Sequence, residues 1–164
     1  KTSGSHVLMP GRVAFLASFQ SSGVALSNVG PDAEQIVFNR AVINIGNCYN
    51  TSTGYFTAPV GGVYAFNWDF RLQEIDSAIN YFQIYTTKND TPANGTSIVD
   101  KDVFVLTVDV NSDLVSDSSY RSFSQSSMFS LVAGDTIKIT YSHNGGADQV
   151  DINGESHFMG YLIG

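Results

Sequence analysis

Hydrophobic and polar residues alternate along most of the chain, and the spacing expected of a helix is nearly absent. The clearest case is the segment 63–71, where every second position is aromatic: Tyr64, Phe66, Trp68 and Phe70. Because successive side chains of a strand point to opposite faces, this pattern predicts a half-buried β-strand whose aromatic face belongs to a core. Trp68 is therefore expected inside the domain.

Other short segments show comparable apolar or alternating patterns. They are 13–19, 36–38, 41–45, 55–58, 79–87, 103–110, 122–132, 136–142 and 156–163. Turn-forming pairs lie within or between the later segments: Gly134-Asp135, Asn144-Gly145 and Asn153-Gly154. Short strands separated by such turns are typical of a β-sandwich or jelly roll. We predict one all-β domain over 11–164, preceded by a flexible lead-in over 1–10.

The composition favours a folded extracellular domain and disfavours two classes of partner. Only 14% of the 164 residues are charged, and the net charge is −7. Binding to nucleic acid or to an anionic membrane surface needs clustered Lys and Arg, whereas the basic residues here are scattered. No apolar run approaches the roughly 20 residues that a membrane-spanning helix needs. We therefore expect no nucleic-acid partner and no membrane insertion.

The single cysteine and the glycosylation sequons bear on the compartment. Cys48 has no second cysteine with which to form an internal disulfide, so it is either a half-buried free thiol or an interchain bridge. Sequons begin at Asn50, Asn89 and Asn94, which agrees with a secreted glycoprotein. Such tripeptides also arise by chance in a chain rich in Ser and Thr. No signal peptide is visible, but a mature chain would have lost it.

The segment 44–66 has the sequence NIGNCYNTSTGYFTAPVGGVYAF, with Asn-x-Gly, Tyr-Asn, Thr-Gly-x-Phe, Ala-Pro and Gly-x-Tyr-x-Phe in that order. This block resembles the central signature of the complement C1q globular-head family. The resemblance covers nearly the whole chain after residue 11. It extends to Val13-Ala-Phe15, Phe38-Asn39, Leu131-x-x-Gly134-Asp135 and Ser156-x-Phe158-x-Gly160-x-Leu162.

The resemblance implies a ten-stranded jelly-roll β-sandwich, the architecture that the family shares with tumour necrosis factor ligands. It also implies a homotrimer packed around an aromatic axis. Apolar residues on both faces of the segment 158–163 agree with a subunit interface. Many family members carry a collagen stalk before the head, whereas residues 1–11 lack glycine at every third position. We therefore expect a stalkless head, and stalkless members in invertebrates are often soluble lectins.

The sequence shows no catalytic motif, so we do not expect an enzyme. The histidines are His6, His143 and His157, and their spacing is not that of zinc ligands. Neither a G-x-S-x-G nucleophile turn nor a glycine-rich phosphate loop is present. Structural roles are expected for all three histidines.

Calcium is the one metal that the residues bring into consideration, although no cofactor is required. The segment that begins at Asp109 starts like an EF-hand loop but has Leu114 and Tyr120 where glycine and glutamate are needed. A second acidic cluster precedes the last strand. In this family that loop often lies near the trimer apex, where a cation would relieve the repulsion between three copies of the cluster. A solvated acidic loop is the alternative for these residues: Asp148, Asp151, Asn153 and Glu155.

Ligand recognition by such a fold falls to loops and strand ends. Candidate side chains outside the inferred core are Tyr81, Tyr85, Tyr120, Arg121, Tyr141 and His143. An acidic sugar such as sialic acid favours arginine, because a guanidinium pairs bidentately with a carboxylate. Arg71 and Arg121 stand at strand ends beside polar segments, with ordinary surface arginines as the alternative. Adjacent strand residues point to opposite faces, so Tyr120 and Arg121 can share one ligand only if their segment is a loop.

The function favoured at this point is a secreted pattern-recognition lectin, homotrimeric, that binds glycans or glycoproteins through its loops. The alternative is a protein-binding ligand that engages receptors without binding sugar. A structural protein of an extracellular matrix is a third class.

Overall fold

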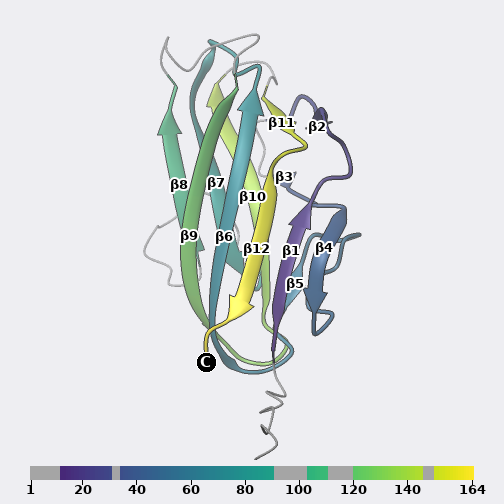
Figure 1. Cartoon of the computed structure of the whole chain (residues 1–164). Coiled ribbons are helices and arrows are strands. Elements are labelled where there is room, and N and C mark those ends of the chain that lie inside the picture. Colours follow the sequence, from purple (N-terminus) through teal and green to yellow (C-terminus); the bar gives the residue numbers. More distant parts are fainter. Residues whose placement is uncertain (1–11, 31–33, 91–102, 111–119, 146–149) are drawn as a thin grey trace, which may run out of the picture.

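The computed structural model describes residues 12–30, 34–90, 103–110, 120–145 and 150–164. In this part of the chain twelve β-strands form two antiparallel sheets packed face to face, and no helix is present. The two sheets lie one behind the other in Figure 1. The strands are β1 (Ala14–Ser18), β2 (Val24–Leu26), β3 (Glu34–Gln35), β4 (Arg40–Ile45), β5 (Phe56–Thr57), β6 (Gly62–Gln73), β7 (Ile79–Lys88), β8 (Val103–Asp109), β9 (Arg121–Leu131), β10 (Thr136–Gly145), β11 (Asp151–Asn153) and β12 (His157–Leu162).

Sheet A has seven strands, in the order β2-β11-β6-β12-β1-β4, with β9 also paired with β6. The long strand β6 pairs with β9 over its length, whereas β12 and β11 pair with its first and last parts in turn. Sheet B has five strands, in the order β3-β10-β7-β8, with β5 also paired with β10. This is the jelly-roll sandwich that the alternation and the family block predict.

The differences from the predicted strands concern the shortest elements. The strands β2 and β11 have three residues each and pair with one another, but neither is long enough to show an alternating pattern. The predicted strand at 36–38 is instead represented by β3 at Glu34–Gln35. A backbone hydrogen bond from Ile36 N to Ile139 O, at 2.9 Å, continues the pairing of β3 with β10 past the end of β3. The structure thus has twelve described strands where ten were expected.

Aromatic side chains from both sheets fill the space between them. The inner face of β6 consists of Tyr64, Phe66, Trp68 and Phe70, each at most 2% exposed. The indole of Trp68 packs edge-on against Phe70 and donates a hydrogen bond to Thr86 Oγ1 of β7 at 3.0 Å. Trp68 therefore satisfies its one polar group across the core, as a buried indole must. The predicted core position of Trp68 is confirmed.

Two glycines of the family-like segments that follow the central block are required by the fold, one by its backbone conformation and one by packing. Gly134 lies in the turn between β9 and β10 with φ of 94°, a conformation that favours glycine over residues with a Cβ. A Cβ at Gly160 of β12 would lie 2.4 Å from a ring carbon of Phe66. The missing side chain at Gly160 is what lets the Phe66 ring lie against β12.

Candidate functional site

The outer face of sheet A carries a band of apolar side chains at one end. The strand register aligns one residue from each of five neighbouring strands in a single row across the face: Ile45, Ala14, Tyr161, Ala65 and Met128. The large members of this row are open to solvent, with Met128 63%, Tyr161 52% and Ile45 48% exposed. Exposed aliphatic and aromatic groups are ordinary one by one, but a contiguous group of them marks an interaction surface.

The same face becomes polar toward its other end. The next row is mixed, and it comprises Ile43, Leu16, Met159, Asn67 and Ser126. The third row is polar or charged throughout, and it comprises Arg40, Ser18, His157, Asp69 and Ser124. Sheet A therefore presents an apolar half and a polar end on one continuous surface, because β6, β9 and β12 run through all three rows.

Arg71, Tyr120 and Glu155 lie together beyond the third row, and we call them the arginine cluster. The Arg71 guanidinium carbon lies 3.7 Å from the centre of the Tyr120 ring, so cation and ring are stacked. Glu155 forms an ion pair with the same guanidinium. The side chain of Arg71 is 28% exposed and that of Glu155 is 61% exposed, so solvent reaches both.

The backbone holds the arginine cluster in place. Arg71 pairs with Ser122 across β6 and β9, which brings Tyr120, two residues before Ser122, diagonally next to Arg71. The backbone N–H of Arg71 also donates to Ser156 Oγ at 2.9 Å. The guanidinium therefore projects from a strand whose position is determined on both sides. Such a partly exposed, stacked guanidinium can accept a planar anion at its edge.

A groove of about 540 Å³ adjoins the arginine cluster on the outer face of sheet A. Its apolar walls include Leu16, Val42 and Met159, and its polar rim includes Arg40, His157 and Glu155. Glu155 belongs to both the groove and the arginine cluster. Arg40 was not among the residues that the sequence predicted for ligand binding. In the sequence only its charge marks Arg40 as a possible ligand residue. Its position in the same row as His157 depends on the pairing of β4 with β1 and of β1 with β12.

Several predicted ligand residues lie in or behind the core, which corrects the expectation that they stand outside it. Tyr141 is 0% exposed and stacks on Phe82 between the sheets, and His143 is 5% exposed beside it. Tyr85 is 5% exposed on sheet B and donates to Gln83 Oε1 at 2.6 Å. Alternation along β7 and β10 does not tell which face is covered, and this is why the sequence misplaced them.

The remaining predicted residues divide between the two sheets. Tyr81 is half-buried on sheet B, where its hydroxyl accepts a hydrogen bond from Asn144 Nδ2 at 3.2 Å. Arg121 is the first residue of β9 and pairs with Leu72, so it lies on the opposite face of the sheet from Arg71. Its guanidinium donates to the Tyr120 carbonyl oxygen at 3.1 Å. Tyr120 therefore shares its ring with Arg71, not with the neighbouring Arg121.

In the described part of the chain, the residues proposed for calcium each have a separate partner within the protein. Asp151 is 6% exposed and accepts a hydrogen bond from Asn28 N at 2.9 Å. Asn153 Oδ1 accepts from Glu155 N at 3.1 Å, and the Glu155 carboxylate pairs with Arg71. No three or more His, Cys, Asp or Glu side chains among the described residues could hold a metal together. Asp148 lies outside the described residues, so calcium binding that includes it stays a prediction.

Cys48 is buried, at 2% exposure, and its Sγ lies 3.6 Å from Asn44 Oδ1. Burial raises the pKa of the thiol to about 11. The thiol is therefore protonated and enclosed at neutral pH, which favours the free thiol over the interchain bridge.

Comparison with protein families gives a match that spans almost the whole domain. The family model of the C1q domain matches residues 14–163. No curated protein sequence matches the chain. In the described part of the chain, no helix has the length and apolar character needed to cross a membrane.

Solved structures with this fold share little sequence with the chain. The globular domain of zebrafish complement 1qA protein has 21% identity and a TM-score of 0.61, with 93% of this chain and 98% of that chain covered. The Eiger TNF structure from S. frugiperda has 14% identity and a TM-score of 0.65, with 93% and 92% covered. Murine APRIL at pH 5.0 has 14% identity and a TM-score of 0.58, with 92% and 98% covered. These likenesses show the jelly-roll fold.

Proposed function

The chain belongs to the C1q domain family, and from that premise we propose that it is the glycan-binding head of a secreted, non-enzymatic homo-oligomer. The observation that carries the proposal is the gradient on the outer face of sheet A, from an apolar half to the arginine cluster. One continuous surface offers a place for other copies of the chain and, beyond it, a charged ligand site. The proposal requires no cofactor.

The apolar half is the part we assign to assembly. Met128, Tyr161 and Ile163 line a depression of about 510 Å³ on this face, together with Phe104 of β8 in sheet B. Side chains of this kind, when desolvated by a partner, stabilise an interface by roughly 25 cal/mol per Å² of apolar surface. Every copy presents the same band, and three such bands can meet around a three-fold axis, so a closed symmetric assembly can remove this apolar surface from water. We favour the homotrimer, the assembly that the family resemblance implies.

The arginine cluster is the part we assign to the ligand. With a net charge of −7 the chain gains nothing from long-range attraction to an anionic glycan, so any such binding must come from local contacts. The Arg71 guanidinium can pair with a sugar carboxylate, and the exposed Tyr120 ring offers a face to the sugar's C–H groups. A ligand carboxylate would compete with Glu155 for the guanidinium. This supports recognition of an acidic glycan such as a sialylated one.

Titration calorimetry of the purified protein with sialyllactose and with lactose tests this site. We expect Arg71→Ala to weaken binding of sialyllactose by about 10- to 150-fold, the loss of about 1.5–3 kcal/mol for a hydrogen bond to a charged group. Arg71→Lys should also weaken it, because an ammonium cannot form the paired bonds. Arg12→Ala is the matched control, since Arg12 is exposed and lies just before β1, at the end of sheet A that carries the apolar row of Ala14 and Tyr161. Thermal melting of each variant shows whether it is folded.

The outcomes separate the assignments. Equal binding of the two sugars by the parent protein overturns the acidic-glycan assignment. A loss that follows Arg121→Ala instead of Arg71→Ala places the site on the other face of sheet A. Absence of binding across a glycan array overturns glycan recognition and leaves the receptor-binding alternative.

A further inference from the structure

The asparagines of two of the three glycosylation sequons lie in the described part of the chain, and the fold uses them differently. Asn50-Thr51-Ser52 occupies the loop between β4 and β5. Asn89 directly follows β7 and begins the second sequon. Attachment of an N-linked glycan replaces one hydrogen of the side-chain amide nitrogen. The partners of that nitrogen therefore decide whether the folded domain can carry the sugar.

Every polar group of Asn50 except the side-chain amide nitrogen forms a hydrogen bond within the loop. Its backbone N–H donates to Tyr55 O at 2.9 Å, and its backbone carbonyl accepts from Gly54 N at 2.8 Å. Its side-chain oxygen accepts from Ser52 N at 2.9 Å and from Thr53 N at 3.3 Å, which is an Asx turn. The residue is exposed, and its amide nitrogen donates to no described residue. The turn thus points the oxygen inward and leaves the nitrogen to solvent.

Asn89 uses both ends of its side-chain amide. The nitrogen donates to Asp135 Oδ1 at 2.8 Å, and the oxygen accepts from Thr136 N at 2.9 Å. These bonds join the end of β7 to the turn before β10. Asp135 also pairs with Lys88 at 3.2 Å. Asn89 is exposed, but a sugar that replaced either hydrogen of its amide nitrogen would lie beside the Asp135 carboxylate and would crowd the junction between the two segments.

The loop of Asn50 also lies apart from the surface proposed for assembly. The side chain of Gln35 in β3 donates to the Thr53 carbonyl oxygen, and a Cβ at Gly54 would lie 3.0 Å from Ile36 O. The loop is therefore packed beside β3 of sheet B. Ile45 of β4, the edge strand of sheet A, is the member of the apolar row nearest to this loop in sequence, whereas Tyr161 and Met128 lie two and four strands farther across the sheet. A glycan at Asn50 projects from the loop into solvent and leaves the centre of that row available.

We propose that Asn50 is an N-glycosylation site of this protein and that Asn89 is left unmodified in the mature form. The inference rests on the extracellular location in the proposed function. The donor is a lipid-diphosphate-linked oligosaccharide: the amide nitrogen loses a proton and bonds to the anomeric carbon, whose bond to the diphosphate oxygen breaks. Transfer to the nascent chain offers both sequons, and folding then retains the chains whose glycan the structure can accommodate.

Secretion from a eukaryotic cell line with a supplied signal sequence tests the proposal. The background carries Asn94→Gln, because the third sequon lies outside the described residues. Intact masses are compared before and after enzymatic release of N-glycans. We expect the background protein to lose the mass of one glycan. The added change Asn50→Gln should abolish that loss, as should Ser52→Ala, which removes the sequon but keeps the Asx oxygen. Asn89→Gln should leave the loss unchanged.

Peptide mapping of the background protein gives a second measurement that does not depend on the variants being secreted. Release of the glycan in H₂¹⁸O marks an occupied asparagine as heavy aspartate. The mark on the Asn50 peptide alone is the expected result. An unmarked Asn50 peptide overturns the assignment, and a marked Asn89 peptide overturns the exclusion. Neither readout involves ligand binding, so failure here leaves the proposed glycan recognition standing, and loss of that recognition leaves this site standing.

Discussion

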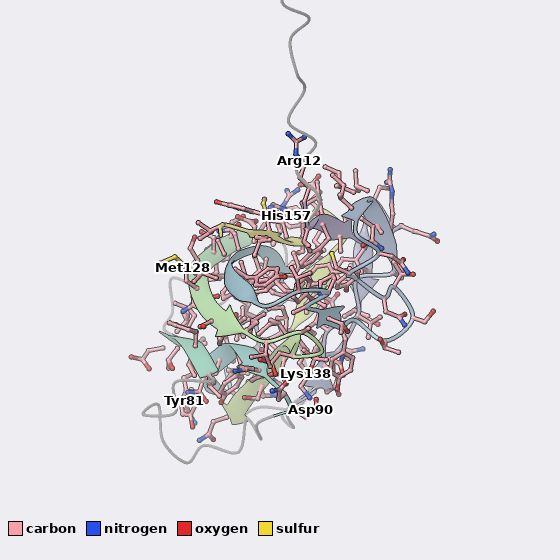
Figure 2. All side chains as sticks on the ribbon, turned by 90° about the horizontal axis from the view of Figure 1, so that it is seen from below. Arg12, Tyr81, Asp90, Met128, Lys138 and His157 are labelled. Atoms are coloured by element: carbon pink, nitrogen blue, oxygen red, sulfur yellow. The ribbon has the colours of Figure 1, made fainter. Side chains whose placement is uncertain are left out.

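The outer faces of the two sheets differ in how their side chains are satisfied. Met128 and His157 lie on the sheet A side of the molecule, whereas Tyr81, Asp90 and Lys138 lie on the sheet B side (Figure 2). On sheet B the polar groups bond across the strands: the Gln83 amide nitrogen donates to Thr107 Oγ1 at 3.0 Å, and the Gln83 amide oxygen accepts from Tyr85. Sheet A instead presents Met128 at 63% exposure and Tyr161 at 52%.

The difference indicates which face requires a partner. Hydrogen bonds within sheet B pair several of its outer groups without another molecule, and Lys138 and Asp90 add an ion pair of 2.7 Å to that surface. The buried hydroxyls of Thr87 and Thr140 on the same face have no hydrogen-bond partner among the described residues. Hydrogen bonds within the sheet cannot stabilise an exposed apolar band in this way, because only contact with another apolar surface removes the band from water. The domain therefore has one outer face whose polar side chains bond largely to one another and one outer face whose apolar half is suited to burial by other copies.

The largest expected effect comes from breaking the core that supports both faces. Trp68→Ala should lower the free energy of unfolding by about 3–5 kcal/mol, because burial is lost and a cavity remains. The Thr86 hydroxyl also loses its indole partner. Urea denaturation followed by fluorescence of the tyrosines or by circular dichroism measures the change. A variant of parental stability would mean that β6 does not anchor the sandwich.

A charge placed on one face or the other tests the comparison directly. Met128→Asp should raise the dissociation constant of the proposed assembly by at least about 100-fold, or about 2.7 kcal/mol, because an unpaired carboxylate would be buried at the contact. Thr107→Asp adds the same charge to the exposed outer face of sheet B and should leave assembly unchanged. Sedimentation equilibrium measures both. Equal weakening by the two changes would remove the distinction between the faces, and a monomeric parent protein would remove the assembly itself.

The smallest expected effect is a pH dependence at the end of sheet B where β7 ends and β10 begins. Hydrogen bonds from Asn89 and from Val132 N, with Lys88 beside them, hold the pKa of the Asp135 carboxyl below its ordinary value of 3.8. Since this pKa is lower in the folded state, its stabilisation is complete above the unfolded value and is lost as pH falls through the folded one.

Asp135→Asn should therefore flatten the acid limb of the stability curve while lowering stability at neutral pH. Urea midpoints measured across the acidic range for the parent and the variant show the difference. Parallel curves would mean that this carboxylate contributes nothing to the polar pairing of sheet B. Asp109→Asn, which removes the same charge from an exposed position of β8, serves as the control for a simple change in net charge.

The strand pattern was predictable wherever a segment was long enough to alternate. The aromatic period over 63–71 predicts β6, and with it the burial of Trp68, which the structure confirms at 1% exposure. The three-residue strands β2 and β11 were missed because two or three positions carry no period. The turn at Gly134-Asp135 was predicted from residue chemistry alone, and Gly134 has the positive φ that such turns favour.

The candidate site was only partly predictable, because its members come from distant segments. Arg71 and Tyr120 were both candidates, but their stacking follows from the register of β6 with β9, which no local pattern contains. Tyr141 and His143 were misplaced for a related reason. Alternation shows that a strand has two faces, and only the packing of the second sheet decides which of them is covered.

The sequence by itself determined the all-β class, the aromatic inner face of β6, the tight turn before β10 and the family to which the domain belongs. These properties depend on local chemistry: the period of two along a strand, the positive φ open to glycine and a contiguous block of family-like residues. Only the tertiary structure decided that Arg71 meets Tyr120, that Tyr141 is enclosed, and that one outer face is apolar at one end and charged at the other. Those properties depend on strand order and register, which are set by the collective burial of the core and not by any one segment.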